Sequence, residues 1–215
     1  MQGFFEPLRR PYVALARLGG AVSVSRYDAK QPVIPQVQFS MTLQAIIIRA
    51  DGAFAETEEL RRLAFITAFK EAGFDWTVDR TAFGATRKLG TLKARMSHFV
   101  RQYIKRGGDA PDIEQLISAM HRRACKVFHK LVSDGALEPR AGIRELVVSA
   151  RQEGVRLALT GNLKREDADN MLVHALGSRA LEMFECMTLV SNAEEAVSDE
   201  DLYRETLRQL DVDPN

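Results

Sequence analysis

The fold of this chain is decided by one short stretch, Ala45-Ile46-Ile47-Ile48-Arg49-Ala50-Asp51-Gly52. The apolar, β-branched run from Leu43 to Ile48 is typical of a strand buried in a parallel sheet. The polar residues from Arg49 to Gly52 predict a loop that ends this strand. Apolar residues then recur at helical spacing from Glu56 to Ala72, and Gly73 stops the pattern, so we expect a helix to leave the loop.

The composition is that of an ordinary globular chain. Of the 215 residues, 46% are hydrophobic and 27% are charged, which argues against a fibrous or disordered protein. The 30 Lys and Arg residues nearly cancel the 29 Asp and Glu residues, so no overall positive field favours nucleic acid or an anionic membrane. Apolar runs such as Val155 to Leu159 are far shorter than the roughly 20 residues that cross a bilayer. We therefore expect neither a nucleic-acid partner nor a membrane partner.

Cysteine and histidine spacing argues against a disulfide scaffold and against a metal centre. Cys125 and Cys186 lie far apart and form no CxxC or Cys/His ligand pattern. The four histidines are His98, His121, His129 and His174. They lack the clustered spacing of metal ligands, so we expect them to be surface residues or hydrogen-bonded ones. The sequence thus predicts no metal site and a reducing, cytoplasmic environment.

Residues 1–40 differ from the rest of the chain and predict an N-terminal extension. Prolines interrupt this segment at Pro7, Pro11, Pro32 and Pro35, which disfavours a long helix or a central strand. The segment is basic but lacks the compact apolar core of a secretory signal, so we interpret it as an irregular or loosely docked arm. A plastid transit peptide is the alternative interpretation.

The remaining chain alternates between helical and strand patterns. Between residues 57 and 137 the pattern is helical, with helices expected at Leu92 to Ile104 and Asp112 to Val132 and no convincing strand. After Pro139 the expected elements are a helix at 142–153, a strand at 155–159, a helix at 165–176, a strand at 187–191 and a terminal helix capped by Ser198. This alternation is typical of a parallel α/β sheet.

Several local stretches resemble one protein family. The stretch from Ala45 to Glu59 is similar to the first motif of the haloacid dehalogenase (HAD) superfamily, a strand followed by D-x-D-G-T-[LV]. The continuation Ala55-Glu56-Thr57-Glu58-Glu59 resembles the CbbY-like branch, which lies near the β-phosphoglucomutases. Three further stretches carry the same resemblance: Glu71 to Trp76, Gly90 to Arg95 and Pro139 to Leu146.

The resemblance implies an α/β fold with a HAD-like (Rossmannoid) parallel sheet core and an inserted all-helical cap. The core would comprise residues 41–56 and 138–215, and the cap residues 57–137. The final family motif, an acidic pair that completes the magnesium site, would come after residue 215. We therefore expect a core that is truncated at the C-terminus.

The same resemblance shows where this chain departs from the catalytic pattern. In the family, the first Asp of the motif attacks the phosphoryl group and ligates magnesium, and the second Asp acts as general acid and base. This chain has Arg49 at the first position and keeps the second as Asp51, while Ala53 replaces the motif's Thr. A guanidinium carries only donors and repels a divalent cation, so it cannot replace the nucleophile.

The other family motifs are retained only in part. The Ser or Thr that ends the next core strand is present as Thr160, followed by Gly161 and Asn162. The Lys partner should lie in a stretch that aligns with residues 196–203, where the lysines are absent and only Asp201-x-Tyr203 fits. Phosphate-ester hydrolysis needs accelerations up to ~10²¹, which come from positioning and charge neutralisation. We therefore expect no family-type turnover.

The candidate site residues follow from the same motifs. Asp51 and Thr160 are the residual catalytic positions. The candidate ligand-binding residues are Arg49, Asp51, Gly52, Glu56, Lys93, Arg95, Thr160, Gly161 and Asn162. Two interpretations of Arg49 stay open, since it could bind a phosphate in place of magnesium or simply pair with Asp51. Lys93 and Arg95 could bind the ligand or be solvated, and Glu56 could lie near a sugar or serve as a helix N-terminal acid.

The sequence thus predicts a pseudophosphatase that binds a phosphorylated sugar or acts as a regulatory or assembly protein, with no cofactor. The alternative is a residual sugar-phosphate phosphatase of the CbbY type, for which magnesium would be the cofactor. A third possibility is a decayed gene copy without a selected function. A truncated core leaves one flank of the sheet bare, so either the N-terminal arm or a second chain should cover that flank. We favour a homodimer or a heteromer formed through this sheet edge.

Overall fold

A sheet of four strands forms the centre of the molecule. The structure is a computed structural model that describes residues 13–16, 43–104, 112–190 and 197–212. The strand order is β1-β2-β3-β4. Strands β2 (Ala45–Arg49), β3 (Arg156–Gly161) and β4 (Cys186–Leu189) are parallel, as the β/α alternation predicted, whereas β1 (Val13–Ala16) pairs antiparallel with β2.

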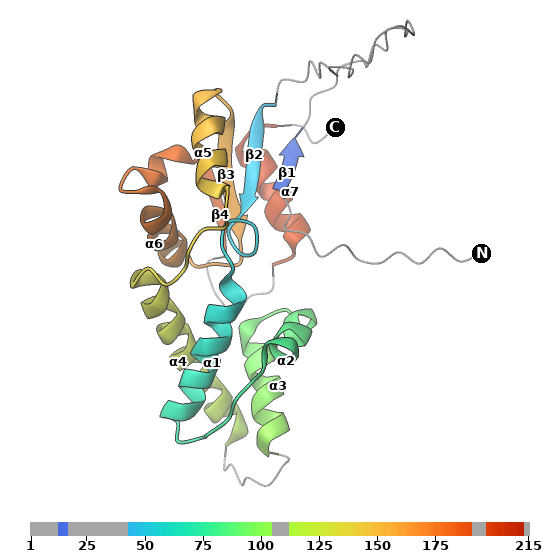
Figure 1. The fold of residues 1–215 in the computed structure, drawn as a ribbon. Coiled ribbons are helices and arrows are strands. Elements are labelled where there is room, and N and C mark those ends of the chain that lie inside the picture. The colour runs from blue at the N-terminus through green and yellow to red at the C-terminus, as the bar shows by residue number, and fades with distance from the viewer. Residues whose placement is uncertain (1–12, 17–42, 105–111, 191–196, 213–215) are drawn as a thin grey trace, which may run out of the picture.

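Alternate residues of β2 face two different layers of the core. Ile46 and Ile48 belong to the larger apolar cluster, while Ala45 and Ile47 belong to a smaller one that includes Leu210. This alternation is the period of two that a strand imposes on its side chains. Helices α5 (Ile143–Gln152) and α6 (Arg165–Leu176) lie on one side of the sheet and α7 (Asp199–Gln209) on the other (Figure 1). Both faces of β2 are therefore buried.

A group of helices is inserted between β2 and the α5–β3 passage and lies beyond one end of the sheet (Figure 1). Its members are α1 (Thr57–Glu71), α2 (Arg80–Ala85), α3 (Leu92–Ile104) and α4 (Ile113–Ser133). Its core contains edge-to-face pairs of Phe65 with Phe69, Phe83 and Phe99. Such aromatic pairs bury large apolar areas and restrict how the helices pack. The predicted helical insertion is thus present, with no strand among its described residues.

The predicted helix starts are visible as side-chain caps. The Asp112 carboxylate accepts a hydrogen bond from the backbone N–H of Gln115, and Ser198 Oγ accepts one from the N–H of Asp201. Each bond satisfies one of the donors that a helix start leaves open. The short helix α2 and two 3-10 turns, at Thr86–Leu89 and Ala180–Met183, were not predicted, because segments this short carry little periodicity.

Strand β1 shows that four residues of the N-terminal arm, which was interpreted as irregular or loosely docked, form a regular strand of the sheet. Val13 pairs with Ile48 and Ala16 with Ala45, so four residues of the arm extend the sheet beyond β2. The prolines flank this segment and do not interrupt it, which leaves its backbone donors available for a ladder. The rest of the 1–40 extension lies outside the described residues. Part of the arm thus pairs with the β2 edge of the sheet, and the homodimer or heteromer stays a prediction.

The longest helix is α4, with 21 residues. None of the described helices combines the length and the apolar character that crossing a membrane requires.

Candidate functional site

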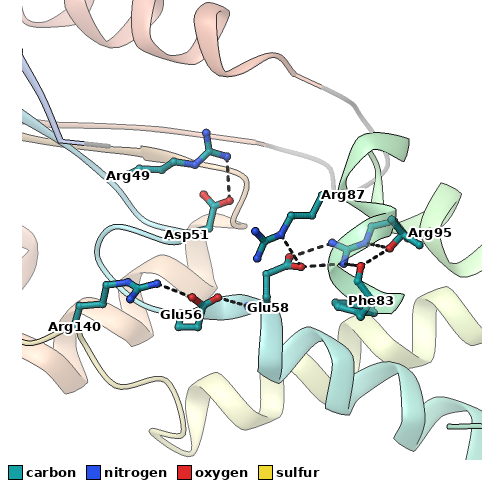
Figure 2. Close-up of polar contacts among 9 residues, drawn as sticks. Arg49, Asp51, Glu56, Glu58, Phe83, Arg87, Arg95 and Arg140 are labelled. Atoms are coloured by element: carbon teal, nitrogen blue, oxygen red, sulfur yellow. Dashed lines mark hydrogen bonds and ion pairs between the residues drawn. The ribbon is translucent and has the colours of Figure 1, made fainter. Parts of the chain in front are cut away.

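Arg49 ends β2 and lies between two carboxylates. Its Nη2 donates to Asp51 Oδ2 over 3.1 Å, and its Nη1 pairs with Asp199 at the start of α7. Figure 2 shows the Arg49 and Asp51 side chains pointing toward each other. Burial alone would lower the pKa of Arg49, but the hydrogen bond to Asp199 and the charge of Asp51 outweigh it and raise this pKa further. The guanidinium is therefore a permanent cation with both ends engaged.

The second carboxylate oxygen of Asp51 is held by the turn after β3. Asp51 Oδ1 accepts a hydrogen bond from the backbone N–H of Asn162 over 3.1 Å. Gly161 has φ +150°, and a Cβ built there would lie 2.4 Å from this same oxygen. Only glycine permits so close an approach of backbone and carboxylate. Asp51 is thus fixed by Arg49 on one side and by residues 161–162 on the other.

The loop between β2 and α1 is closed by Arg140. Its Nε donates to the Gly52 carbonyl over 2.5 Å, and its Nη2 donates to Glu56 Oε2 over 2.6 Å. Glu56 Oε1 accepts from the N–H of Glu58, so Glu56 caps α1. This contact favours the helix-start interpretation of Glu56. Thr160 is buried and donates its hydroxyl hydrogen to the carbonyl of Thr188 on β4.

Arg95 is part of a buried ion-pair network rather than a solvated side chain. It is 3% exposed, and its Nη1 and Nη2 donate to the two oxygens of Glu58 over 3.1 and 3.0 Å. The guanidinium carbon lies 4.0 Å from the centre of the Phe83 ring. Arg87 reaches Glu58 from the solvent side, so Glu58 lies between two arginines (Figure 2).

The pKa of Glu58 records this arrangement. Burial alone would raise this pKa, but the hydrogen bonds and charges of Arg95 and Arg87 outweigh it and hold it below the ordinary 4.5. Arg95 therefore fixes α3 to α1. Lys93, its neighbour in the motif, lies in the first turn of α3 and is half-buried.

The residues at the end of β2 do not fit a magnesium ion. Magnesium binds through oxygen ligands, and Arg49 presents only donors where the family pattern has a carboxylate. Asp51 directs its oxygens to Arg49 and to the Asn162 N–H. Among the described residues, no group of three or more His, Cys, Asp and Glu side chains could hold a metal ion.

A pocket opens between α1, α4 and the loop that follows β3. It has a volume of about 410 Å³. The lining combines apolar side chains such as Phe65 and Phe128 with Arg61, Asn162 and Lys164. Pockets of this size and mixed lining are typical of small-molecule sites. Of the nine predicted ligand-binding residues, only Asn162 lines it.

Arg61 is the buried cation of this pocket. It is 8% exposed, its Nη2 donates to the Asn162 carbonyl over 2.7 Å, and its guanidinium carbon lies 5.5 Å from the Phe128 ring centre. Its Nε has no hydrogen-bond partner among the described residues. Burial lowers the pKa of Arg61, although the nearby carboxylates oppose this effect. A buried guanidinium with an unused donor is a strong recognition point for an anion.

Sequence reasoning missed Arg61, although a signal was present. Leu63 is one of the apolar residues that recur at helical spacing in this stretch, but it is 42% exposed in the structure. The buried face instead runs through Thr57, Arg61, Ala64, Phe65 and Ala68. These residues recur at intervals of three and four, so the helical period itself placed Arg61 inside. A charged residue on that face was the available indication of a site.

The chain is similar to proteins of known family. It is 32% identical over 172 residues to protein CbbY of Cereibacter sphaeroides, an alignment that covers 80% of this chain and 73% of that protein. This chain belongs to the CbbY-like branch of the HAD superfamily. It is also 25% identical over 174 residues to protein CbbY of Rhodobacter capsulatus, covering 81% of this chain and 74% of that one. No protein-family profile matches the chain.

Solved structures agree with this assignment. The CbbY-like chain superimposes on a mutant form of CbbY from Rhodobacter sphaeroides in complex with xylulose-(1,5)bisphosphate, with a TM-score of 0.63 and 31% identity. The match covers 77% of this chain and 72% of that one. A HAD-superfamily hydrolase from Geobacter sulfurreducens shares the fold alone, with a TM-score of 0.54 and 16% identity. The predicted family and the α/β, HAD-like fold class are confirmed.

Proposed function

We propose that this CbbY-like chain has lost phosphatase turnover and binds a phosphorylated sugar in the pocket beside Arg61. The observation that carries the first part is the double ion pair of Arg49. A HAD-type phosphatase needs a carboxylate oxygen at this position to attack phosphorus, and a guanidinium supplies no such oxygen. The function therefore becomes recognition of a ligand instead of its conversion.

The arrangement around Asp51 supports the loss of turnover. A general acid or base must reach the reacting atoms, whereas both Asp51 oxygens are engaged by Arg49 and by the Asn162 N–H. Removing the nucleophile and the metal ligand together removes the interactions that neutralise charge in phosphoryl transfer. The alternative, a magnesium-dependent phosphatase, requires Asp51 or another carboxylate to catalyse the reaction without that nucleophile and metal ligand.

The pocket supports the binding part of the proposal. Arg61 offers an unused buried donor, and Lys164 adds an exposed cation at the rim. Asn162 connects this pocket to Asp51, because its carbonyl binds Arg61 and its N–H binds Asp51. A structure of a CbbY relative contains a sugar bisphosphate, which suggests that ligand class for this chain.

The loss of turnover is tested by phosphate release. The wild-type chain and an Asp51→Asn variant are assayed with magnesium, p-nitrophenyl phosphate and xylulose 1,5-bisphosphate. We expect both proteins to release phosphate at the background rate. Release by the wild type that disappears in the Asp51→Asn variant would establish the phosphatase alternative instead.

Binding is tested separately by thermal shift with xylulose 1,5-bisphosphate. A ligand at 100 times its Kd stabilises the native state by about 2.7 kcal/mol, which is readily detected. We expect a rise in melting temperature for the wild type and none for Arg61→Met. Lys130→Met is the matched control, because Lys130 lies on α4, is exposed and does not line the pocket. A wild type that shows no shift would refute the binding proposal and favour the regulatory or assembly role.

A further inference from the structure

A thiol and an imidazole lie one helical turn apart on the pocket side of α4. Cys125 Sγ is 3.5 Å from His121 Nε2, and both residues line the pocket. His121 is 3% exposed, whereas Cys125 is partly exposed and can be reached from the pocket. An imidazole at this distance can accept the thiol proton. This arrangement activates a cysteine when the imidazole nitrogen that faces the sulfur is the unprotonated one.

The pocket that Cys125 borders has more basic than acidic side chains in its lining. The pocket lining contains six basic or imidazole side chains: Arg61, His121, Arg122, Lys126, His129 and Lys164. Two carboxylates, Glu166 and Asp167, also line it, and Asp167 is hydrogen-bonded to His129 over 2.7 Å. Nearby cations favour a thiolate over a thiol and attract anionic reagents.

Arg61 provides an independent sign that the pocket accepts an anion. Its Nε is buried without a hydrogen-bond partner among the described residues, on the α1 wall that faces α4. An unused buried donor costs free energy unless a ligand group satisfies it. The thiol and this donor border the same cavity of about 410 Å³.

We propose that Cys125 is a modification site that exchanges with small anionic disulfides entering this pocket. The Cys125 thiolate attacks one sulfur of the disulfide, forming a new S–S bond as the old one breaks. The departing thiolate takes up the proton that the Cys125 thiol first gave to His121. The incoming disulfide is the oxidant, and one small thiol leaves for each protein mixed disulfide formed. The step does not depend on the sugar-phosphate role of the pocket.

Cys186 is an internal control for this proposal. It lies on β4 and is also partly buried, so both cysteines are partly accessible. Burial and the adjacent Glu185 raise the pKa of Cys186, although Arg156 opposes them. A thiol in such surroundings stays protonated and reacts slowly. One chain thus contains a candidate reactive thiol and a reference thiol.

The test compares the two cysteines in full-length chains. Cys186→Ser leaves Cys125 as the only thiol, and Cys125→Ser leaves Cys186. Both are treated with dianionic 5,5′-dithiobis(2-nitrobenzoate) and with neutral 4,4′-dithiodipyridine, and the released thiol is followed by absorbance. We expect Cys125 to react with the anionic reagent at least about tenfold faster than Cys186. The ratio should be smaller with the neutral reagent.

A second variant checks the electrostatic part without disturbing the core. Lys126 is exposed, so Lys126→Gln in the Cys186→Ser background should fold normally while slowing the anionic reagent more than the neutral one. Equal rates at the two cysteines, or no effect of reagent charge, would overturn the proposal. If Cys125 exchanges slowly but xylulose 1,5-bisphosphate still raises the melting temperature, this inference is refuted and the proposed function is not. If Cys125 exchanges fast but xylulose 1,5-bisphosphate leaves the melting temperature unchanged, the binding part of the proposed function is refuted and this inference is not.

Discussion

Replacing Gly161 by alanine tests whether Asp51 is fixed against the turn after β3. The alanine Cβ would lie 2.4 Å from Asp51 Oδ1, and the backbone φ of +150° is one that L side chains rarely adopt. The carboxylate cannot simply swing away, because Arg49 and the Asn162 N–H hold it. Backbone strain of this kind costs about 1 to 3 kcal/mol. Losing the charged hydrogen bond from Asn162 costs about 1.5 to 3 kcal/mol more.

We therefore expect Gly161→Ala to lower the free energy of unfolding by roughly 3 to 5 kcal/mol. Gly154→Ala is the matched control, since Gly154 has φ +72° but nothing within 4 Å of the added Cβ. That change should cost only about 1 to 2 kcal/mol. Urea unfolding with an m-value of about 3 kcal/mol/M would place the Gly161→Ala midpoint at least roughly 0.3 M below the control.

The decisive comparison is a double-mutant cycle with Asp51→Ala. Removing the carboxylate removes the 2.4 Å collision, so Gly161→Ala should cost only the backbone strain of about 1 to 3 kcal/mol in this background, where contacts of 3.3 Å with Ala50 Cβ and N remain. The test also works if the Gly161→Ala single variant does not fold, since the double variant, which lacks the colliding carboxylate, should fold again. An unchanged cost of Gly161→Ala without the Asp51 carboxylate would refute the reasoning.

Three further predictions follow from the ion pairs and from the arm. Arg95→Met should lower the free energy of unfolding, measured in urea, by about 3 kcal/mol, because it leaves the half-buried Glu58 with one partner. Arg87→Gln, at the exposed partner, should lower it by about 0.5 kcal/mol. Equal costs of the two substitutions would contradict the buried ion pair. Because the pKa of Glu58 is lowered on folding, its stabilisation is complete above pH 4.5 and is lost as pH falls through the lower folded pKa; Glu58→Gln should reduce the acid-induced loss of stability, and an unchanged profile would oppose this. Finally, only one of the two adjacent N–H groups of Val13 and Ala14 points at β2, so proline at that position should break the β1–β2 pairing and expose the β2 edge, whereas proline at the other should not. Light scattering should therefore reveal self-association in one of the variants Val13→Pro and Ala14→Pro but not in both. If both variants are monomeric, the sheet edge is not an interaction surface.

The elements with strong local patterns could be predicted from the sequence. The helix expected at 165–176 is found at Arg165–Leu176, and the strand expected at 155–159 is found at Arg156–Gly161. The signals that define these elements, the spacing of apolar residues and the glycines at their ends, lie within a few positions of each other in the chain. Strand β1 was missed because its four residues lie in a proline-rich arm, where local signals oppose a strand.

At the end of β2 the sequence shows which residue replaces the nucleophile, but it does not show which side chains contact one another. The motif alone indicated that Arg49 replaces a nucleophile, and it allowed pairing with Asp51, which the structure contains. It could not reveal that Arg95 pairs with Glu58, 37 positions earlier in the chain, or that Arg61 donates to the Asn162 carbonyl, 101 positions later. Such contacts depend on tertiary packing, which periodicity does not encode. The ligand roles of the nine candidate residues stay predictions.

The pairing of β1 with β2 has a consequence for the order of folding. Strand β2 has one neighbour about 30 positions earlier in the chain and another, β3, about 110 positions later, with the whole helical insertion between them. Closing the longer loop costs about 1 kcal/mol more entropy than closing the shorter one. Nascent β2 can therefore acquire its arm-side neighbour while the helical insertion is still being synthesised, which would shield one edge of an apolar strand during the wait for β3.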